Sequence, residues 1–159
     1  MSRTSTVPAQ NANVRTRPLA THIGAEILDV DVSREISAET FGQIEALWQQ
    51  HGVLLFRDQR LSEEAQIRFA GLFGPLAKVV LTTAGTSARN PSLARVSNIR
   101  ENGKLIGVAP DGELLFHSDQ SYLEKPAKAT LLYAIEVPSR GGNTLACRSC
   151  STGTLIYIG

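Results

Sequence analysis

The chain has 159 residues, of which 42% are hydrophobic, and 16 Lys and Arg nearly balance 15 Asp and Glu. This length suits one domain with a buried core, and a net charge of +1 lacks the basic excess of nucleic-acid or polybasic membrane binders. Apolar runs such as Val53 to Phe56 are far shorter than the ~20 residues of a membrane span, so we expect a cytoplasmic protein with neither nucleic acid nor membrane as partner.

The N-terminal stretch is predicted to be a disordered tail over residues 1–16, because it lacks periodic apolar positions. From Leu19 to Val32 apolar and polar residues interleave, which indicates one or two strands around Gly24. His22 lies in this segment with no acid or Cys at ligand spacing, so we interpret it as a solvated loop or edge histidine.

Two helices are expected to flank a buried strand in the next stretch. The first has Ser37 as its N-cap, apolar residues at helical spacing, and Gly52 as its stop. The run Val53 to Phe56 is short and continuously apolar, which is typical of a buried strand. The second helix begins after Ser62 and ends at Gly74.

The pattern then changes to strands. Leu93 to Ile99 and Leu105 to Val108 flank the dipeptide Asn102–Gly103, which favours a type I′ hairpin turn. Leu114 to Asp119 and Thr130 to Val137 are further predicted strands. So few strands would leave open sheet edges, which native proteins normally cover or close.

His117 and Asp119 stand two residues apart, so in an extended chain their side chains point the same way. Such a pair is two thirds of the 2-His-1-carboxylate arrangement of non-haem Fe(II) oxygenases. Without further context the alternative is a hydrogen-bonded His and Asp pair on a strand.

Three phrases carry a resemblance to a known family: IGAEILDVDVS, HGVLLFRDQRLSEEAQIRFAGLFGPL and FHSDQSYLEKPAKATLLYAIEVPSRGGNTL. In order and wording they resemble the taurine dioxygenase / TfdA family of Fe(II)- and 2-oxoglutarate-dependent dioxygenases. The match runs from Leu19 to Leu145. The HxD motif is embedded as HSDxSY and followed by PSRGGNTL, which makes the resemblance specific.

The resemblance implies an α+β, mostly β fold: a double-stranded β-helix, jelly-roll and cupin-like, with flanking N-terminal helices. His117 and Asp119 match the first two iron ligands, and Thr144 matches the hydroxyl that contacts 2-oxoglutarate. Gly141 and Gly142 let the backbone turn into that strand.

The implied reaction uses Fe(II), with 2-oxoglutarate and O2 as cosubstrates. It releases succinate and CO2 and hydroxylates a small, anionic organic substrate. A homo-oligomer is compatible with these features.

Three residues depart from the family pattern. Phe116 replaces a Trp before the ligand His, and Asn143 replaces the Asp of GGDT. Glu113 stands where taurine-specific members keep an Asn that touches substrate, which argues against taurine itself.

The largest departure concerns the third ligand, because no His follows His117 and no Arg in family context pairs with 2-oxoglutarate. After Leu145 the family wording stops, and Cys147 and Cys150 form a lone CxxC that we interpret as neither a zinc nor a redox site. We therefore expect a partial dioxygenase domain over 17–145, with an incomplete barrel, and an aberrant, frameshifted tail over 146–159. The alternatives are a catalytically inactive truncated fragment and a cupin-like, non-enzymatic binding module.

Overall fold

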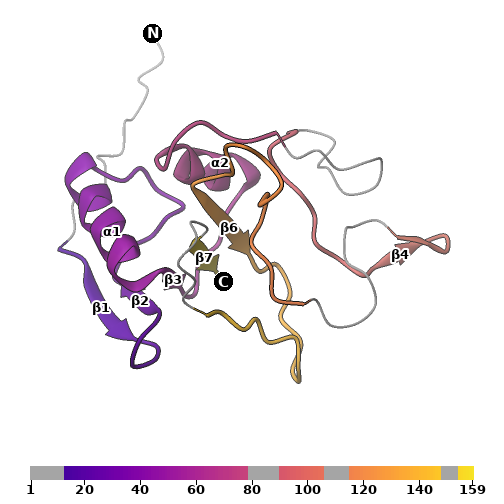
Figure 1. Cartoon of the computed structure of the whole chain (residues 1–159), viewed down its shortest axis with the longest axis horizontal. Coiled ribbons are helices and arrows are strands. Elements are labelled where there is room, and N and C mark those ends of the chain that lie inside the picture. Colours follow the sequence, from indigo (N-terminus) through magenta and orange to yellow (C-terminus); the bar gives the residue numbers. More distant parts are fainter. Residues whose placement is uncertain (1–12, 79–89, 106–114, 148–153) are drawn as a thin grey trace, which may run out of the picture.

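A computed structural model of the chain describes residues 13–78, 90–105, 115–147 and 154–159. Two helices pack on a five-stranded sheet, and a small hairpin lies away from them (Figure 1). In chain order the elements are β1 (Arg15–Pro18), β2 (Ala25–Leu28), α1 (Ala38–His51), β3 (Val53–Phe56), α2 (Glu63–Gly71), β4 (Arg100–Glu101), β5 (Lys104–Leu105), β6 (Ala129–Tyr133) and β7 (Thr154–Ile158).

The sheet has the strand order β1-β2-β3-β7-β6. β1 runs antiparallel to β2, and every other neighbouring pair is parallel. β7, the last strand in the chain, therefore lies between β3 and β6, which precede it by many residues. Among the described residues, no helix is long and apolar enough to cross a membrane.

One face of the sheet carries the hydrophobic core. Strand alternation and register bring Leu54, Ile156 and Leu131 into one row across β3, β7 and β6. A second row holds Phe56 and Ile158 beside it. The four large side chains of β3 and β7 in these rows are fully buried.

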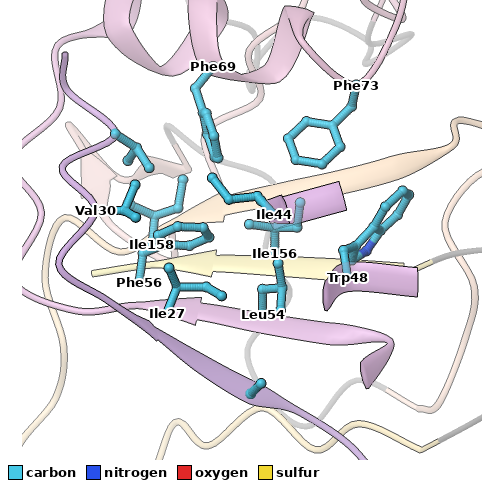
Figure 2. Packing of buried hydrophobic residues seen from close by; sticks show 12 residues of the cluster. Ile27, Val30, Ile44, Trp48, Leu54, Phe56, Phe69, Phe73, Ile156 and Ile158 are labelled. Atoms are coloured by element: carbon cyan, nitrogen blue, oxygen red, sulfur yellow. The ribbon is translucent and has the colours of Figure 1, made fainter. Parts of the chain in front are cut away.

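The helices close this face with aromatic side chains. Figure 2 shows Phe69 and Phe73 pointing at the strand residues, with Trp48 at one end of the cluster. Phe56 meets Phe69 edge to face at 5.6 Å between centroids, and Phe73 meets Trp48 at 5.4 Å. Such edge-to-face contacts add stabilisation beyond the buried area.

The predicted helix signals are confirmed at both N-termini. Ser37 Oγ accepts from Thr40 N at 3.1 Å, and Ser62 Oγ accepts from Ala65 N at 3.2 Å. α1 ends at His51, and Gly52 follows as its C-cap with φ 74°, as predicted. α2 ends three residues before Gly74, because the backbone beyond it continues in tighter turns with bonds between residues three apart.

The strand predictions have mixed outcomes. β3 and the Asn102–Gly103 turn are confirmed, with φ of 50° and 77° at the two turn residues. The strand predicted over Leu93–Ile99 is wrong, since only Ala94 within it forms an isolated β-bridge, and the hairpin strand consists of Arg100 and Glu101. Residues 106–108 lie outside the described part.

The fold class is a mixed sheet with two helices on one face, and the double-stranded β-helix stays a prediction. β1 begins at Arg15, two residues before the predicted start of the domain. The division at 145 and the frameshifted tail also stay predictions. In the structure, β7 lies beyond that boundary and contributes Ile156 and Ile158 to the core.

A buried carboxylate on β2 pairs with arginines from the two neighbouring segments, β1 and the residue after β3. Glu26 of β2 is 4% exposed, and its side chain accepts from Arg17 Nη2 at 2.6 Å and lies 3.5 Å from Arg57 Nε. Mainly the hydrogen bond from Arg17, and also the charges of both arginines, hold the pKa of Glu26 below its usual value of 4.5 despite burial.

The depressed pKa of Glu26 predicts acid sensitivity. Its contribution to stability is present above the unfolded-state value and is lost as pH falls through the lower folded-state pKa. We expect Glu26→Gln to flatten the dependence of the unfolding free energy on pH below about 4.5, measured by urea unfolding at several pH values. Asp29→Asn is the comparison, because Asp29 is half exposed and its pKa is lowered by Arg15 alone. An equal slope in Glu26→Gln and wild type would contradict this role.

Candidate metal centre

His117 is positioned by a hydrogen bond within its own loop. The predicted strand over Leu114–Asp119 is wrong for the described residues 115–119, which form an irregular segment and a turn. No described strand pairs with this segment, and the free carbonyl of Leu115 instead lies 2.8 Å from His117 Nδ1. Because a carbonyl only accepts, we assign the imidazole proton to Nδ1. Nε2, on the other side of the ring, then takes no part in this hydrogen bond.

Asp119 is oriented from the sheet. Thr130 Oγ1 on β6 donates to Asp119 Oδ2 at 2.7 Å, and the other oxygen, Oδ1, lies 3.3 Å from His117 Nε2. The two predicted metal ligands therefore face each other. Each is held by a hydrogen bond on its far side, as outer-sphere partners orient metal ligands in known sites.

The donor set fits a cation. With Nδ1 protonated, neutral His117 turns its Nε2 lone pair toward a carboxylate oxygen, which is unfavourable unless a positive charge lies between them. Two donors that each lie about 2.1 Å from one ion at a right angle are about 3 Å apart, close to the 3.3 Å observed. The alternative is a protonated His117 that forms an ion pair with Asp119.

The pair is open to solvent and has two members. The side chains of His117 and Asp119 are 58% and 47% exposed. Within the described ranges, no group of three or more His, Cys, Asp or Glu side chains is placed to hold a metal. A third ligand does not come from the part of the chain that the structure describes.

Thr144 does not join this pair. It is exposed in an irregular segment, and no hydrogen bond within the described ranges links it to His117 or Asp119. Gly141 and Gly142 take φ of 71° and 66°, so the backbone turns there as predicted, but the described residues 143–147 that follow are irregular and do not form the predicted strand. At Gly142 a Cβ would also lie 2.7 Å from Pro138 Cγ, so the position favours glycine.

Thr130 is the site residue that sequence reasoning missed. The sequence indicates it only as a strand residue, next to Leu131, which packs on the core. Alternation turns its hydroxyl to the opposite face, toward Asp119. The sequence feature that could have indicated this role is a polar residue in a predicted strand, at a position that alternation turns away from the core.

The predicted departures from the family pattern fall in exposed or undescribed parts. Phe116, beside His117, is 68% exposed. Cys147 is exposed and free. Glu113 and Cys150 lie outside the described residues.

Comparison with known proteins identifies the family. The model of the taurine catabolism dioxygenase TauD, TfdA family matches residues 15–151. The chain belongs to the TauD/TfdA family. This confirms the family resemblance that the HxD loop and its flanking phrases indicate.

The curated relatives that this chain matches are about twice as long as the chain. It is 32% identical over 143 residues to the alpha-ketoglutarate-dependent 2,4-dichlorophenoxyacetate dioxygenase of Cupriavidus pinatubonensis, covering 85% of this chain and 50% of the relative. It is 35% identical to pentalenolactone F synthase of Streptomyces avermitilis, covering 82% and 43%. A solved taurine dioxygenase from Burkholderia xenovorans matches 49% of this chain and 28% of its own, with TM-score 0.45 and 32% identity. The chain thus spans about half the length of these curated relatives.

Proposed function

We propose that this protein is an Fe(II)- and 2-oxoglutarate-dependent dioxygenase in which His117 and Asp119 are two of the iron ligands. The observation that carries the proposal is their geometry: Nε2 and Oδ1 converge at 3.3 Å while Leu115 O and Thr130 Oγ1 hold their other polar atoms. Membership in the TauD/TfdA family supports the same ligand set.

Each residue has a defined task in this proposal. Leu115 O fixes the tautomer of His117, so that Nε2 presents its lone pair to the metal. Thr130 fixes the carboxylate plane of Asp119 and leaves Oδ1 for the metal. Thr144 supplies a hydroxyl to 2-oxoglutarate. When bound, iron with its cosubstrates supplies the oxidation, with release of succinate and CO2.

The proposed substrate is a small organic anion. The name of the Cupriavidus relative specifies a carboxylate, 2,4-dichlorophenoxyacetate. We propose a substrate of the same chemical class for this protein because it is similar to that relative. We also propose that the protein acts in the cytoplasm.

A catalytically inactive fragment is the second candidate. The observation that favours it is that only two metal-ligating side chains converge in the described ranges. Two protein ligands leave more positions to water than the three of the facial arrangement and bind the ion less tightly.

An anaerobic titration separates the two candidates. The chain is mixed with Fe(II) and 2-oxoglutarate, the visible absorption band of the iron chelate is followed, and succinate is measured after oxygen is admitted. The dioxygenase predicts the band and succinate above the level of His117→Ala. A chelate band without succinate supports the inactive fragment, and a chain equal to His117→Ala in both readouts contradicts the iron site.

A further inference from the structure

The hydrogen bond between Asp119 and Thr130 closes a loop of the chain. Thr130 Oγ1 donates to Asp119 Oδ2 at 2.7 Å, and the chain between them runs through turns and bends before it enters β6 at Ala129. The Asp119 side chain is 47% exposed, so water competes for its carboxylate. A hydrogen bond at such a site persists only where the chain already holds its two ends together. The contacts that keep this loop closed therefore decide how well Asp119 is oriented.

Gln120, the residue after Asp119, fixes this loop at two points. Its side-chain oxygen Oε1 accepts from Ala127 N at 3.1 Å, and its backbone carbonyl accepts from Leu123 N at 2.9 Å. Ala127 lies two residues before β6 begins, so the side-chain bond joins the end of the HxD segment to the start of the strand that carries Thr130. This bond shortens the free part of the loop and lowers the entropy cost of closing it.

The backbone of Gln120 takes a conformation that residues with a side chain disfavour. Its φ of 56° lies in the left-handed region, where glycine fits without strain. A glycine at position 120 would relieve the backbone but would lose the bond to Ala127. That hydrogen bond is what the longer side chain adds against the unfavourable backbone.

We propose that Gln120 is a positioning residue, which holds the loop closed so that Thr130 can orient the carboxylate of Asp119. Gln120 acts through these two residues and not on a metal itself. The orientation of Asp119 is a property of the metal-free chain, whereas its consequence for metal binding rests on the iron site proposed above.

The first test follows Asp119 by NMR in the metal-free chain. Three-bond couplings from Cγ of Asp119 to its backbone N and C′ show whether χ1 occupies one rotamer or several. We expect one rotamer in wild type and averaged couplings in Gln120→Met, which keeps the length of the side chain but removes the acceptor. In the same variant the amide of Ala127 should exchange with solvent about 2–10-fold faster, as expected from the loss of one hydrogen bond.

Two further variants separate the hydrogen bond from the backbone conformation. Gln120→Glu keeps an oxygen that can accept from Ala127 N, so both readouts should return toward wild type. Gln120→Gly relieves the backbone but removes the acceptor, so it should behave like Gln120→Met. Gln43→Met is the matched control, because Gln43 Oε1 likewise accepts from a backbone amide, Val14 N at 3.0 Å. Unchanged Asp119 couplings in Gln120→Met, or an equal change in Gln43→Met, overturn the proposal.

Binding of Mn(II) gives the second test. Gln120→Met should weaken the affinity about threefold or more, which is less than the 10–100-fold typical of a residue that bonds a metal ligand directly. In the Thr130→Val chain the same substitution should add almost nothing, because the bond through which Gln120 acts is already absent. Additive effects of the two substitutions overturn the proposal. If wild type and His117→Ala bind Mn(II) equally, the proposed iron site fails, and the Asp119 couplings still decide the role of Gln120.

Discussion

Replacing Ile156 with alanine is expected to lower the free energy of unfolding by about 2–5 kcal/mol. Ile156 is 0% exposed in β7, between Leu54 of β3 and Leu131 of β6. The substitution removes buried methyl and methylene groups and leaves a cavity that the sheet on both sides cannot close. A loss of this size is a large share of the stability of a small domain.

Urea unfolding followed by Trp48 fluorescence measures this loss. Trp48 is the single tryptophan of the chain and is 3% exposed in the same core, so its emission reports on the packing of the sheet. Ile156→Val should cost only about 0.5–1.5 kcal/mol because it removes one methylene-sized group. Ile99→Ala is the control, since Ile99 is 52% exposed and its truncation should be close to neutral. An unchanged midpoint in Ile156→Ala would show that β7 does not lie between β3 and β6 in the core of the sheet.

Replacing either His117 or Asp119 with alanine is expected to lower the affinity of the chain for a divalent cation at least tenfold. The two donors face each other at 3.3 Å, so each substitution leaves a single protein ligand. Binding of Mn(II), measured by electron paramagnetic resonance of the free ion, gives the affinity without requiring activity. His22→Ala and His51→Ala are the matched controls, because these are the other two histidines of the chain.

Thr130→Val tests the positioning of Asp119. It keeps the shape of the side chain but removes the hydroxyl that donates to Oδ2, and loss of such an outer-sphere bond typically costs 10–100-fold in metal affinity. Circular dichroism verifies that the variant keeps the secondary-structure content of the wild-type chain. If Thr130→Val binds Mn(II) like wild type while His117→Ala does not, the hydroxyl has no part in the site. If His117→Ala and His22→Ala bind equally, the His117–Asp119 pair is not a metal centre.

Local chemistry made several parts of this chain readable in advance. The caps at Ser37 and Ser62, the stop at Gly52 and the Asn102–Gly103 turn each depend on residues within about four positions. The phrase around His117 and Asp119 was equally readable, because its wording is specific to the family. At the caps, the helix stop and the turn, interactions between residues close in sequence are sufficient to fix the local structure.

Long-range pairing decided the rest. The Leu93–Ile99 and Leu114–Asp119 segments have strand-like composition, but a strand needs a neighbour for successive backbone groups. The described part of the chain gives these segments only an isolated bridge at Ala94. The pairing of the buried Glu26 carboxylate with Arg57, whose side chain is 55% exposed, likewise joins residues brought together only by the sheet.

The sequence alone determined which residues form the candidate metal pair and to which family the chain belongs. Only the tertiary structure decided how the pair is held, through Leu115 O on one side and Thr130 on the other. It also placed β7, which lies beyond the last family phrase, inside the sheet between β3 and β6. The reason is that residue types and local spacing are written along the chain, whereas partners for backbone and side-chain polar groups depend on which distant segments pack together.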